Sequence, residues 1–354
     1  MIEERFETEF KAPPAAIGRA NGRVNLIGEH LDYQGGMVLP TAIAREAAVA
    51  VGAVRGDVDE IHAERFDETV KRALNAPSDG HWSDYVAGAL QLLRRLGLTE
   101  GPLCVAVESD IPHGAGLSSS AAVIVATIKA CLAAHGAAID NVQVARWAQQ
   151  VEHEFIGMPC GIMDQMAVAM TTQGQALALD THTLAYSVID LPSSHHFAVL
   201  HSGVTRKLED GRYAARRRES EAAAKFLGAP ALCLMSAAQA ARIGDAPPPG
   251  DRRARHVYTE HHRVLKAIDA LTSGDMETFG ALMNGSHASM RDDFEMSTPQ
   301  IDRIADYALH AGALGARLTG GGFGGCIVAC VPAAALQGWV DTMTSEFPNT
   351  RFIG

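Results

Sequence analysis

The sequence predicts a two-domain protein that combines α-helices and β-strands. Its 354 residues exceed the length of one average domain. Short segments rich in Val and Ala, typical of strands, are interspersed with longer segments of helical length, and glycine-rich loops stand between them. Apolar residues make up 47% of the chain and aromatic residues only 6%, so we expect a core built largely from Ala, Val, Leu and Ile.

Charge and cysteine content narrow the class of protein. The formal net charge of -11 argues against general nucleic-acid binding and against adhesion to anionic membranes. The six cysteines are scattered without a CxxC pair, which is typical of reduced thiols in a cytosolic protein. Residues 1–7 are charged, and no apolar run is long enough for a transmembrane helix. We expect a cytoplasmic protein that is a monomer or a weak oligomer.

The first half of the chain is expected to alternate between the two kinds of structure. The predicted helices and strands are a helix over 1–14, strands over 38–54 and 61–70, a helix over 81–96, a strand over 103–109, and helices over 123–134 and 141–155.

The second half is expected to be mostly helical. We predict two strands within 175–200, a basic helix from 211, a flexible break over 243–250, helices that end near 271, 290 and 311, and a strand after 325. The arginines at 216–218 are expected to form a solvated helix face rather than an anion site.

A glycine and serine loop stands between the strand at 103–109 and the apolar helix that follows. It comprises Pro112, His113, Gly114, Ala115, Gly116, Leu117, Ser118, Ser119, Ser120, Ala121 and Ala122. Glycines let the backbone approach a ligand closely, and serines can cap the helix and leave N–H groups pointing outward. A helix N-terminus of this kind binds anions, phosphate above all.

Two known nucleotide loops are excluded. No Gly-Lys-Ser/Thr follows the glycines, so the loop is not a Walker P-loop. The third glycine of GxGxxG is missing, so it is not a Rossmann fingerprint. Taken alone, the loop leaves two alternatives, a well-capped buried helix or a nucleotide site of another kind.

A polar segment near the N-terminus is predicted to lie at the edge of a pocket. Arg23, Glu29, His30 and Asp32 stand close together among apolar neighbours, and four glycines within residues 22–36 allow tight bends around them. The alternative is a surface loop of mixed charge, which would not need so many bends in such apolar sequence.

Three further residues are candidates for a site. Asp164 stands in an otherwise apolar run, where a buried carboxylate needs a partner or a function. Glu152 is part of Glu-His-Glu rather than HExxH, which excludes a zincin site and leaves a solvated helix face as its alternative. Trp82 is either a core residue at a helix start or an aromatic platform for a base.

A second glycine-dense loop lies near the C-terminus. Its glycines are Gly320, Gly321, Gly322, Gly324 and Gly325. So many glycines would weaken a plain turn, so we expect the backbone to approach a ligand or the first glycine loop closely.

Three segments together resemble a known family. Residues 22–30 resemble the galactokinase signature, residues 112–122 the phosphate loop of the GHMP kinases, and residues 315–325 their third, glycine-rich motif. Further segments that resemble galactokinases are 159–165, 253–257 and 282–293. The resemblance covers nearly the whole chain in the same order.

The resemblance implies an α+β protein with the GHMP kinase fold. A ribosomal-protein-S5-domain-2-like domain would span residues 1–190 and a ferredoxin-like α/β domain residues 191–354, with the active site in the cleft between them.

The resemblance also implies an enzyme that transfers the γ-phosphoryl group of ATP to the C1 hydroxyl of galactose, the entry step of the Leloir pathway. Such a transfer needs positioning and charge neutralisation more than covalent help. Asp164 matches the carboxylate near the attacking hydroxyl, as a base or an orienting group, and Arg23 would stabilise that carboxylate and the phosphoryl group. Ser120 and Glu152 match the ligands of Mg²⁺, the expected cofactor beside ATP.

The remaining residues of the implied site divide between sugar and nucleotide. Those that match sugar contacts are Glu29, His30, Asp32, Gly161, Asp164 and Tyr213. Those that match ATP contacts are Trp82, Pro112, Gly114, Ala115, Gly116, Leu117, Ser118, Ser119, Ser120 and Ala121, with Trp82 near the adenine.

This chain departs from the family pattern at Asn21, Leu31 and Gln34, where the family usually has Pro, Thr and Asn. Because Leu31 stands between two expected sugar contacts, it predicts that strict galactose specificity is relaxed, toward a modified galactose.

Other functions remain as alternatives. One is a GHMP kinase for a related sugar, such as galacturonate, arabinose or N-acetylgalactosamine; Glu29 and His30 disfavour galacturonate, which should demand a cation near C6. Another is a non-catalytic sensor of galactose and ATP, against which the intact Arg23 and Asp164 argue. The histidine pairs at 195–196 and 261–262 suit no standard zinc site.

Overall fold

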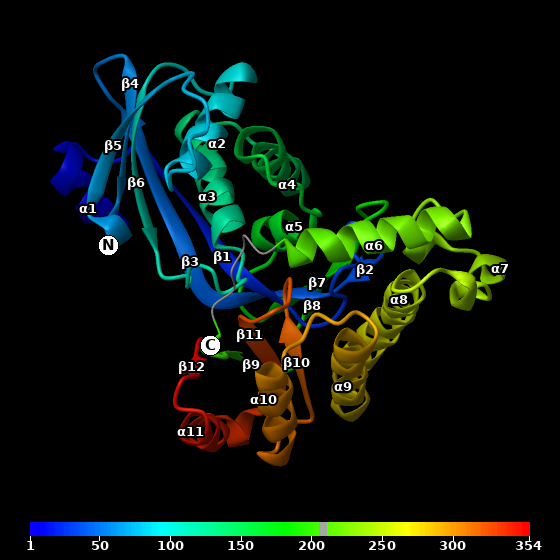
Figure 1. Cartoon of the computed structure of the whole chain (residues 1–354). Coiled ribbons are helices and arrows are strands. Elements are labelled where there is room, and N and C mark those ends of the chain that lie inside the picture. The colour runs from blue at the N-terminus through cyan, green and yellow to red at the C-terminus, as the bar shows by residue number, and fades with distance from the viewer. Residues whose placement is uncertain (205–210) are drawn as a thin grey trace. The chain divides into compact units, whose positions relative to one another are not determined.

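The structure, a computed structural model, describes residues 1–204 and 211–354 (Figure 1). The chain forms two compact units that are interleaved in sequence. Unit 1 comprises residues 1–23, 42–112 and 118–173, and unit 2 comprises residues 24–41, 113–117 and 174–354. The domain division expected at residue 190 remains a prediction.

Unit 1 contains one sheet with helices on it. Its strands are β1 (Ala16–Asn25), β3 (Pro40–Ala53), β4 (Val58–Ala63), β5 (Glu68–Ala73) and β6 (Leu103–Ser109), and β1 and β3 each continue into unit 2 along the chain. β3 pairs with β1 and, antiparallel, with β6, while β4 runs parallel to β6 and antiparallel to β5.

Both faces of this sheet carry apolar residues because both are covered. Helix α1 (Ile2–Phe10) places Ile2 and Phe6 against small side chains of β3 and β6. The other helical elements of unit 1 are η1 (Glu64–Phe66), α2 (Asp84–Arg95), α3 (Ser119–Ala134), α4 (Asn141–Gln150), the π-helical turn η2 (Val151–Ile156) and α5 (Met163–Met170). Helix α3 is apolar almost all round and lies among α2, α4 and α5, as expected of a buried helix (Figure 1).

Unit 2 contains two groups of strands. The first comprises β2 (Met37–Val38), β7 (Gln175–Asp180) and β8 (Tyr186–Asp190), and the second is an antiparallel sheet in the order β10 (Gly315–Thr319), β11 (Cys326–Pro332), β9 (His195–His201), β12 (Arg351–Phe352). Register in the second sheet pairs Val328 of β11 with Arg317 of β10 and Val199 of β9.

Helices pack on this second sheet and on one another. They are α6 (Arg212–Leu227), η4 (Leu232–Leu234), α7 (Ala237–Ala240), η5 (Ile243–Asp245), α8 (Gly250–Ser273), α9 (Met276–Asp292), α10 (Pro299–His310), η6 (Ala333–Ala335) and α11 (Leu336–Glu346). Helices α9 and α10 lie against β10, and α8 packs on both α6 and α9 (Figure 1). Among the described residues, no helix is both long and apolar enough to cross a membrane.

The predicted mixture of helices and strands is confirmed, with three local corrections. Residues 175–200 hold three strands rather than two, because β8 is largely exposed and lacks the apolar alternation that reveals a strand. The helix predicted over 141–155 is α-helical only to Gln150 and ends in the π-helical turn. Residues 243–250, predicted as a flexible break, form η5 and the start of α8.

Candidate active site

Asp164 lies in the first turn of α5, where two side chains of unit 1 hold its carboxylate. Arg23 of β1 donates to Oδ1 from Nε at 2.9 Å and from Nη2 at 2.5 Å. The Ser118 hydroxyl donates to Oδ2 at 2.7 Å. The Arg23 side chain is buried, whereas that of Asp164 is 33% exposed. The protein therefore fixes the carboxylate from one side and leaves it accessible from the other.

Ser118 holds this position at a conformational cost. It is the N-cap of α3 and has φ 59°, in the left-handed region that costs an L-residue roughly 1–2 kcal/mol. Its side chain makes no capping hydrogen bond, because the hydroxyl bonds Asp164 instead. This corrects the expectation for Ser118 as a helix cap and leaves the first-turn N–H groups of α3 without a cap from this side chain.

Ser120 and Glu152 form a second contact beside α3. Ser120 donates to Glu152 Oε1 at 2.9 Å, and the other carboxylate oxygen accepts hydrogen bonds from Gln165 Nε2 and from Cys160 Sγ at 3.5 Å. Glu152 is 5% exposed, so the alternative of a solvated helix face is wrong. Burial and the nearby Asp164 charge raise its pKa above the ordinary range. The π-helical turn that carries Glu152 is a feature often found at functional sites.

The backbone angle φ alternates between positive and negative values along the first glycine loop. Gly114 and Gly116 have φ of 70° and 75°, as Ser118 does at 59°, while Ala115 and Leu117 between them are buried and lie outside the positive-φ region. Alternation of this kind turns successive N–H groups toward a common point and is typical of anion-binding nests.

Trp82 lies at the surface of unit 1, which excludes the core alternative. Its ring stacks on Phe66 with centroids 5.4 Å apart, and Phe66 is half exposed. Its Nε1 donates to Glu68 Oε2 at 2.8 Å, so the ring is held in one orientation.

In unit 2, His30 and Tyr213 come together as the sequence predicts. The His30 ring lies 5.0 Å from that of Tyr213, which α6 supplies, and 4.6 Å from that of Phe294. His30 Nδ1 lies 2.7 Å from the Tyr33 hydroxyl. Two other predicted sugar contacts of unit 2, Asp32 and Tyr213, are half-buried. Gly161 of unit 1 is buried just before α5.

Glu29 has different partners from those expected. It is 1% exposed, and its carboxylate accepts hydrogen bonds from Gly320 N at 2.8 Å, Asn25 Nδ2 at 3.0 Å and the Arg317 guanidinium, with Thr319 Oγ1 at 3.3 Å. All of these partners are protein atoms of unit 2. The expected sugar contact of Glu29 remains a prediction beside these protein contacts.

Two glycines of the second glycine loop lie close to other protein atoms of unit 2. A Cβ at Gly322 would lie 2.7 Å from the Met296 carbonyl oxygen, and one at Gly324 would lie 3.0 Å from Val204. Gly320, Gly322 and Gly324 all have positive φ, which glycine adopts without strain. Close packing within unit 2 thus accounts for Gly322 and Gly324, and Gly321 between them is half-buried. The approach of this loop to a ligand remains a prediction.

Three family models match the chain. They are the N-terminal domain of GHMP kinases over residues 84–172, the galactose-binding signature of galactokinases over 4–53, and the C-terminal domain of GHMP kinases over 267–343. A solved Lactococcus lactis galactokinase, complexed with galactose, is 27% identical with a TM-score of 0.92, over 99% of this chain and 96% of that one.

The chain belongs to the galactokinases of the GHMP kinase superfamily. It is therefore a kinase with the predicted GHMP fold.

More distant kinases share the fold. The Methanococcus jannaschii mevalonate kinase is 20% identical, with a TM-score of 0.73 over 95% of this chain and 96% of that one. The Streptococcus pneumoniae phosphomevalonate kinase, in complex with phosphomevalonate and AMPPNP, is 14% identical, with a TM-score of 0.72 over 96% and 98%.

Two departures from the galactokinase pattern prove to be core residues. Leu31 is fully buried, and its Cβ faces Gly36 beside Cys233. Gln34 is 2% exposed and accepts a hydrogen bond from the Leu232 amide at 3.1 Å. The expectation that Leu31 relaxes the sugar specificity of this galactokinase is not supported, because its side chain packs into unit 2.

The arginines of α6 are only partly solvated. Arg216 Nε donates to the Phe294 carbonyl at 2.7 Å, and the Arg217 guanidinium lies 5.2 Å from the centre of the Tyr33 ring. Only Arg218 of the three is exposed, as expected for a solvated face.

Sequence reasoning missed several residues of this galactokinase that the structure brings into contact with predicted ones. They are Cys160 and Gln165 at Glu152, and His256, Glu260 and Arg317 around Glu29. Arg317 could have been found, because it is a charged residue between Ala316 and Leu318 in an apolar strand.

Proposed function

We propose that this galactokinase transfers the γ-phosphoryl group of ATP to the C1 hydroxyl of D-galactose and so yields galactose 1-phosphate and ADP. The observation that carries the proposal is the Asp164 carboxylate, fixed by Arg23 and Ser118 and accessible on its other side. The galactose-binding signature and the galactose bound to the Lactococcus relative support the sugar, and the AMPPNP complex of the pneumococcal kinase supports the nucleotide.

The hydrogen bonds of Asp164 indicate which oxygen acts on the sugar. A carboxylate accepts about four hydrogen bonds. Within the described residues, Oδ1 accepts two from Arg23, and Oδ2 accepts one from Ser118. The C1 hydroxyl would donate to the remaining position on Oδ2, which either takes the proton or orients the hydroxyl toward the phosphoryl group. Arg23 holds the carboxylate in place and adds positive charge for the phosphoryl oxygens.

Ser120 and Glu152 fit a magnesium ion. They offer a hydroxyl and a carboxylate oxygen 2.9 Å apart, and these are the hard ligands that Mg²⁺ prefers. No cluster of three or more His, Cys, Asp and Glu side chains suited to a metal exists among the described residues, so phosphate oxygens and water would complete the shell. The ion would neutralise phosphate charge, while Gln165 and Cys160 keep the Glu152 carboxylate oriented.

The nucleotide would bind at the first glycine loop and Trp82. The alternating backbone and the start of α3 present N–H groups to the phosphates, and Trp82, stacked on Phe66, offers a face to adenine. The predicted sugar contacts are Glu29, His30, Asp32, Gly161, Asp164 and Tyr213.

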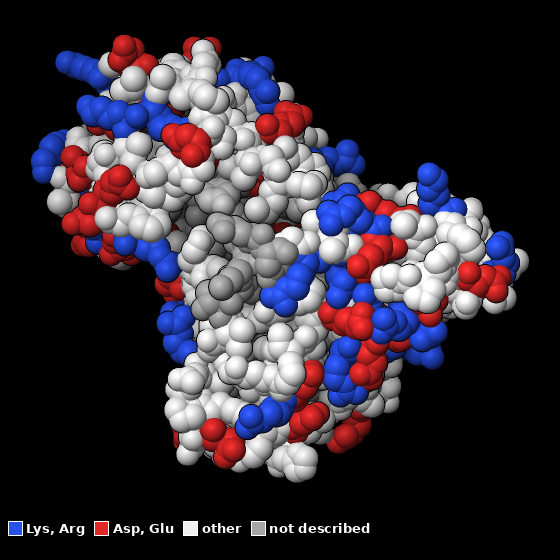
Figure 2. Space-filling model, viewed as in Figure 1, with Lys and Arg blue, Asp and Glu red and all other residues white. Residues whose placement is uncertain are grey.

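We also propose a cytoplasmic monomer or weak oligomer. All six cysteines are free thiols, as a reducing compartment requires. On the face shown in Figure 2, basic and acidic side chains are intermixed, and this fits the expectation that no nucleic acid or anionic membrane is a partner.

A coupled assay for ADP release over a panel of sugars tests the proposal. We expect the highest kcat/KM with galactose and lower values with arabinose, N-acetylgalactosamine and galacturonate. A higher value with one of these would assign the chain to the related sugar. ATP binding without turnover of any sugar would contradict the enzyme and favour the sensor.

A further inference from the structure

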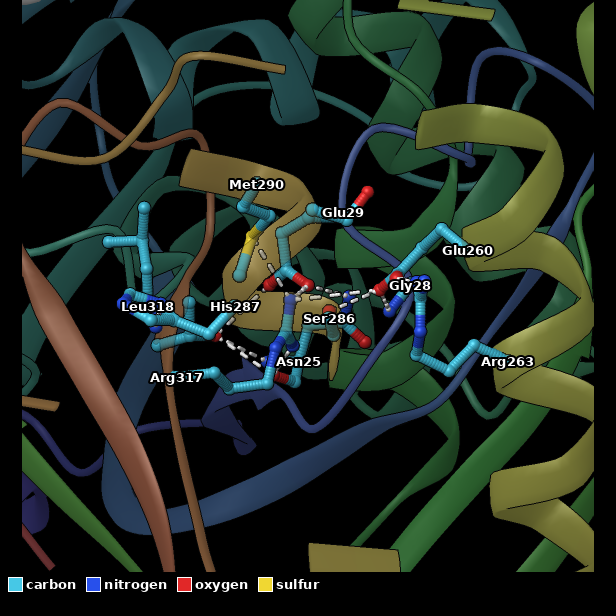
Figure 3. Close-up of polar contacts among 12 residues, drawn as sticks. Asn25, Gly28, Glu29, Glu260, Arg263, Ser286, His287, Met290, Arg317 and Leu318 are labelled. Atoms are coloured by element: carbon cyan, nitrogen blue, oxygen red, sulfur yellow. Dashed lines mark hydrogen bonds and ion pairs between the residues drawn. The ribbon is translucent and has the colours of Figure 1, made fainter. Parts of the chain in front are cut away.

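Buried carboxylates hold backbone groups in both units of this galactokinase. In unit 2, the Glu260 carboxylate accepts a hydrogen bond from the Gly28 amide at 3.0 Å (Figure 3). In unit 1, Asp84 is the first residue of α2 and is only 2% exposed. It follows the segment 74–83, which contains no helix or strand and carries Trp82. We call this segment the Trp82 loop, and the contacts of Asp84 decide how it is held.

The Asp84 carboxylate is surrounded by donors of the protein. Arg72 of β5 donates from Nη2 to Oδ1 at 2.8 Å. Ser78 Oγ and the amides of Asp79 and Gly80 donate to Oδ2 at 2.7, 3.1 and 2.8 Å. These four hydrogen bonds are about as many as a carboxylate accepts. Because three of the four donors belong to the Trp82 loop, the loop closes around a buried negative charge.

Arg72 holds the same loop from its other side. Its Nη2 also donates to the Pro77 carbonyl oxygen at 2.9 Å, and its Nη1 pairs with Asp79 Oδ2 at 3.0 Å. A segment without helix or strand has backbone groups that need other partners, and Arg72 and Asp84 supply them. Removal of either partner would leave a buried charge unpaired, so the pair favours a single conformation of the loop.

A chain of contacts joins this anchor to the Trp82 ring. Asp79 Oδ1 accepts a hydrogen bond from the His81 amide at 3.0 Å, and His81 directly precedes Trp82. The Trp82 Nε1 donates to Glu68 Oε2 at 2.8 Å, and its ring stacks on Phe66 with an interplanar angle of 24°. The buried pair therefore sets the backbone before Trp82, and Glu68 sets the orientation of the ring.

We propose that Arg72 and Asp84 are positioning residues for the nucleotide, which hold the Trp82 loop so that the indole ring meets adenine. They act through Trp82 and do not touch the nucleotide, since both side chains are buried. The proposal rests on the proposed function, because it takes Trp82 as the adenine contact. It predicts that the pair controls affinity for the base of ATP and not for its phosphates.

Equilibrium binding of ATP, which requires no turnover, tests the proposal. D84A removes all four hydrogen bonds, and we expect the Kd for ATP to rise about 10-fold, the size of a stacking contact with a base. Inorganic triphosphate lacks the base, so we expect its Kd to stay within about 2-fold. A Kd for ATP that D84A leaves unchanged, or an equal rise for triphosphate, would overturn the proposal.

A double-mutant cycle shows whether Asp84 acts through Trp82. We expect W82A to raise the Kd for ATP by about the same factor as D84A, and W82A/D84A to bind no more than about 2-fold more weakly than W82A. Losses that multiply would overturn the proposal. Normal ATP binding by W82A would refute the adenine contact of the proposed function and the positioning role with it. Weak binding by W82A beside normal binding by D84A would refute the positioning role alone.

Amide hydrogen exchange and a matched variant control for general unfolding. In D84A the Asp79 and Gly80 amides lose their acceptor, so we expect them to exchange at least 10-fold faster, with α3 and α4 unchanged. D59A removes another buried aspartate of unit 1, which accepts hydrogen bonds from Arg94 and from the Leu103 amide. It should leave both amides protected and the Kd for ATP unchanged. An equal loss of ATP binding in D59A would overturn the proposal.

Two milder variants carry the test if D84A does not fold. D84N keeps an oxygen for the two loop amides, so its Kd for ATP should lie between those of wild type and D84A. Glu68 is exposed, and E68A should weaken ATP binding about 3-fold by releasing the indole N–H, with triphosphate binding unchanged. Unchanged ATP binding in both variants would overturn the proposal.

Discussion

Two carboxylates of this galactokinase differ in what their surroundings leave open. Asp164 and Glu29 each pair with one arginine, Arg23 and Arg317. The Asp164 side chain is 33% exposed and that of Glu29 only 2%. The described partners of Asp164 donate three hydrogen bonds to its carboxylate. Those of Glu29 also donate three, from Gly320, Asn25 and Arg317, because the one proton of the Thr319 hydroxyl goes to the nearer Asn25 carbonyl oxygen.

This difference separates an accessible carboxylate from a buried one. An ion pair in a sequence motif looks the same in both cases, because each is an acidic residue and an arginine far apart in the chain. The exposed side of the Asp164 carboxylate distinguishes them. Arg23 and Glu29 belong to the same short motif, yet they lie in different units.

The largest expected effect is that of Asp164→Asn. The amide keeps the size of the side chain but cannot accept a proton, so we expect kcat to fall about 10³-fold or more with KM for galactose within about 3-fold. Steady-state kinetics in the coupled assay measure both. Activity close to wild type would remove Asp164 from the mechanism and with it the contrast to Glu29.

The stability of the folded protein should depend on pH through His256, which lies beside the buried Glu29. This residue contacts the Glu29 carbonyl oxygen, and burial lowers its pKa from 6.5 to about 4. The unfolded chain therefore binds a proton that the folded protein refuses, so stability is retained above pH 6.5 and lost as the pH falls toward 4. The loss is up to about 3 kcal/mol. Urea unfolding from pH 7 to 4 measures it, and a wild-type curve parallel to that of His256→Gln would contradict it.

The Glu152→Gln variant should bind Mg²⁺ more weakly at the site that we propose for the metal. We expect the Mg²⁺ concentration for half-maximal rate to rise roughly 100-fold. The reason is that the amide keeps the shape of the side chain but loses its negative charge. Titration of activity with Mg²⁺ at saturating ATP measures the shift. Removal of all Mg²⁺ by a chelator should abolish turnover in both proteins. An unchanged Mg²⁺ titration would leave Glu152 a purely structural carboxylate.

A smaller effect, of mixed sign, is expected for Ser118→Gly. Glycine relieves the positive φ and should stabilise the protein by about 1 kcal/mol, while loss of the hydrogen bond to Asp164 should lower kcat about 10-fold. Ser118→Ala also loses the hydroxyl but keeps the strain of the positive φ. It should therefore be both slower and less stable than the glycine variant. Thermal unfolding and kcat together decide. A glycine variant that is as fast as wild type would show that Ser118 does not position Asp164.

Much of the site around Asp164 and Glu152 could be predicted from sequence, but few of the buried contacts around Glu29 could. Asp164 is a carboxylate in an apolar run, which is a local signal. Glu152, Arg23 and Ser120 are indicated only by the resemblance to family motifs. The pairing of Glu29 with Arg317 joins residues 288 positions apart, and neither periodicity nor spacing reports such contacts. Leu31 shows the same limit, since its neighbours in sequence are polar while its own side chain is fully buried.

The π-helical turn at Val151–Ile156 imposes a constraint on chain length rather than on residue type. Glu154 in it is exposed, so substitutions there should be tolerated, whereas His153 Nε2 contacts the Cys160 backbone. Deletion of one residue would let an ordinary α-helix continue and would rotate every later side chain by about 100°. Insertions and deletions in this turn would therefore change the direction in which the following side chains point. We expect homologues with the same chemistry to keep the spacing from Glu152 to Asp164.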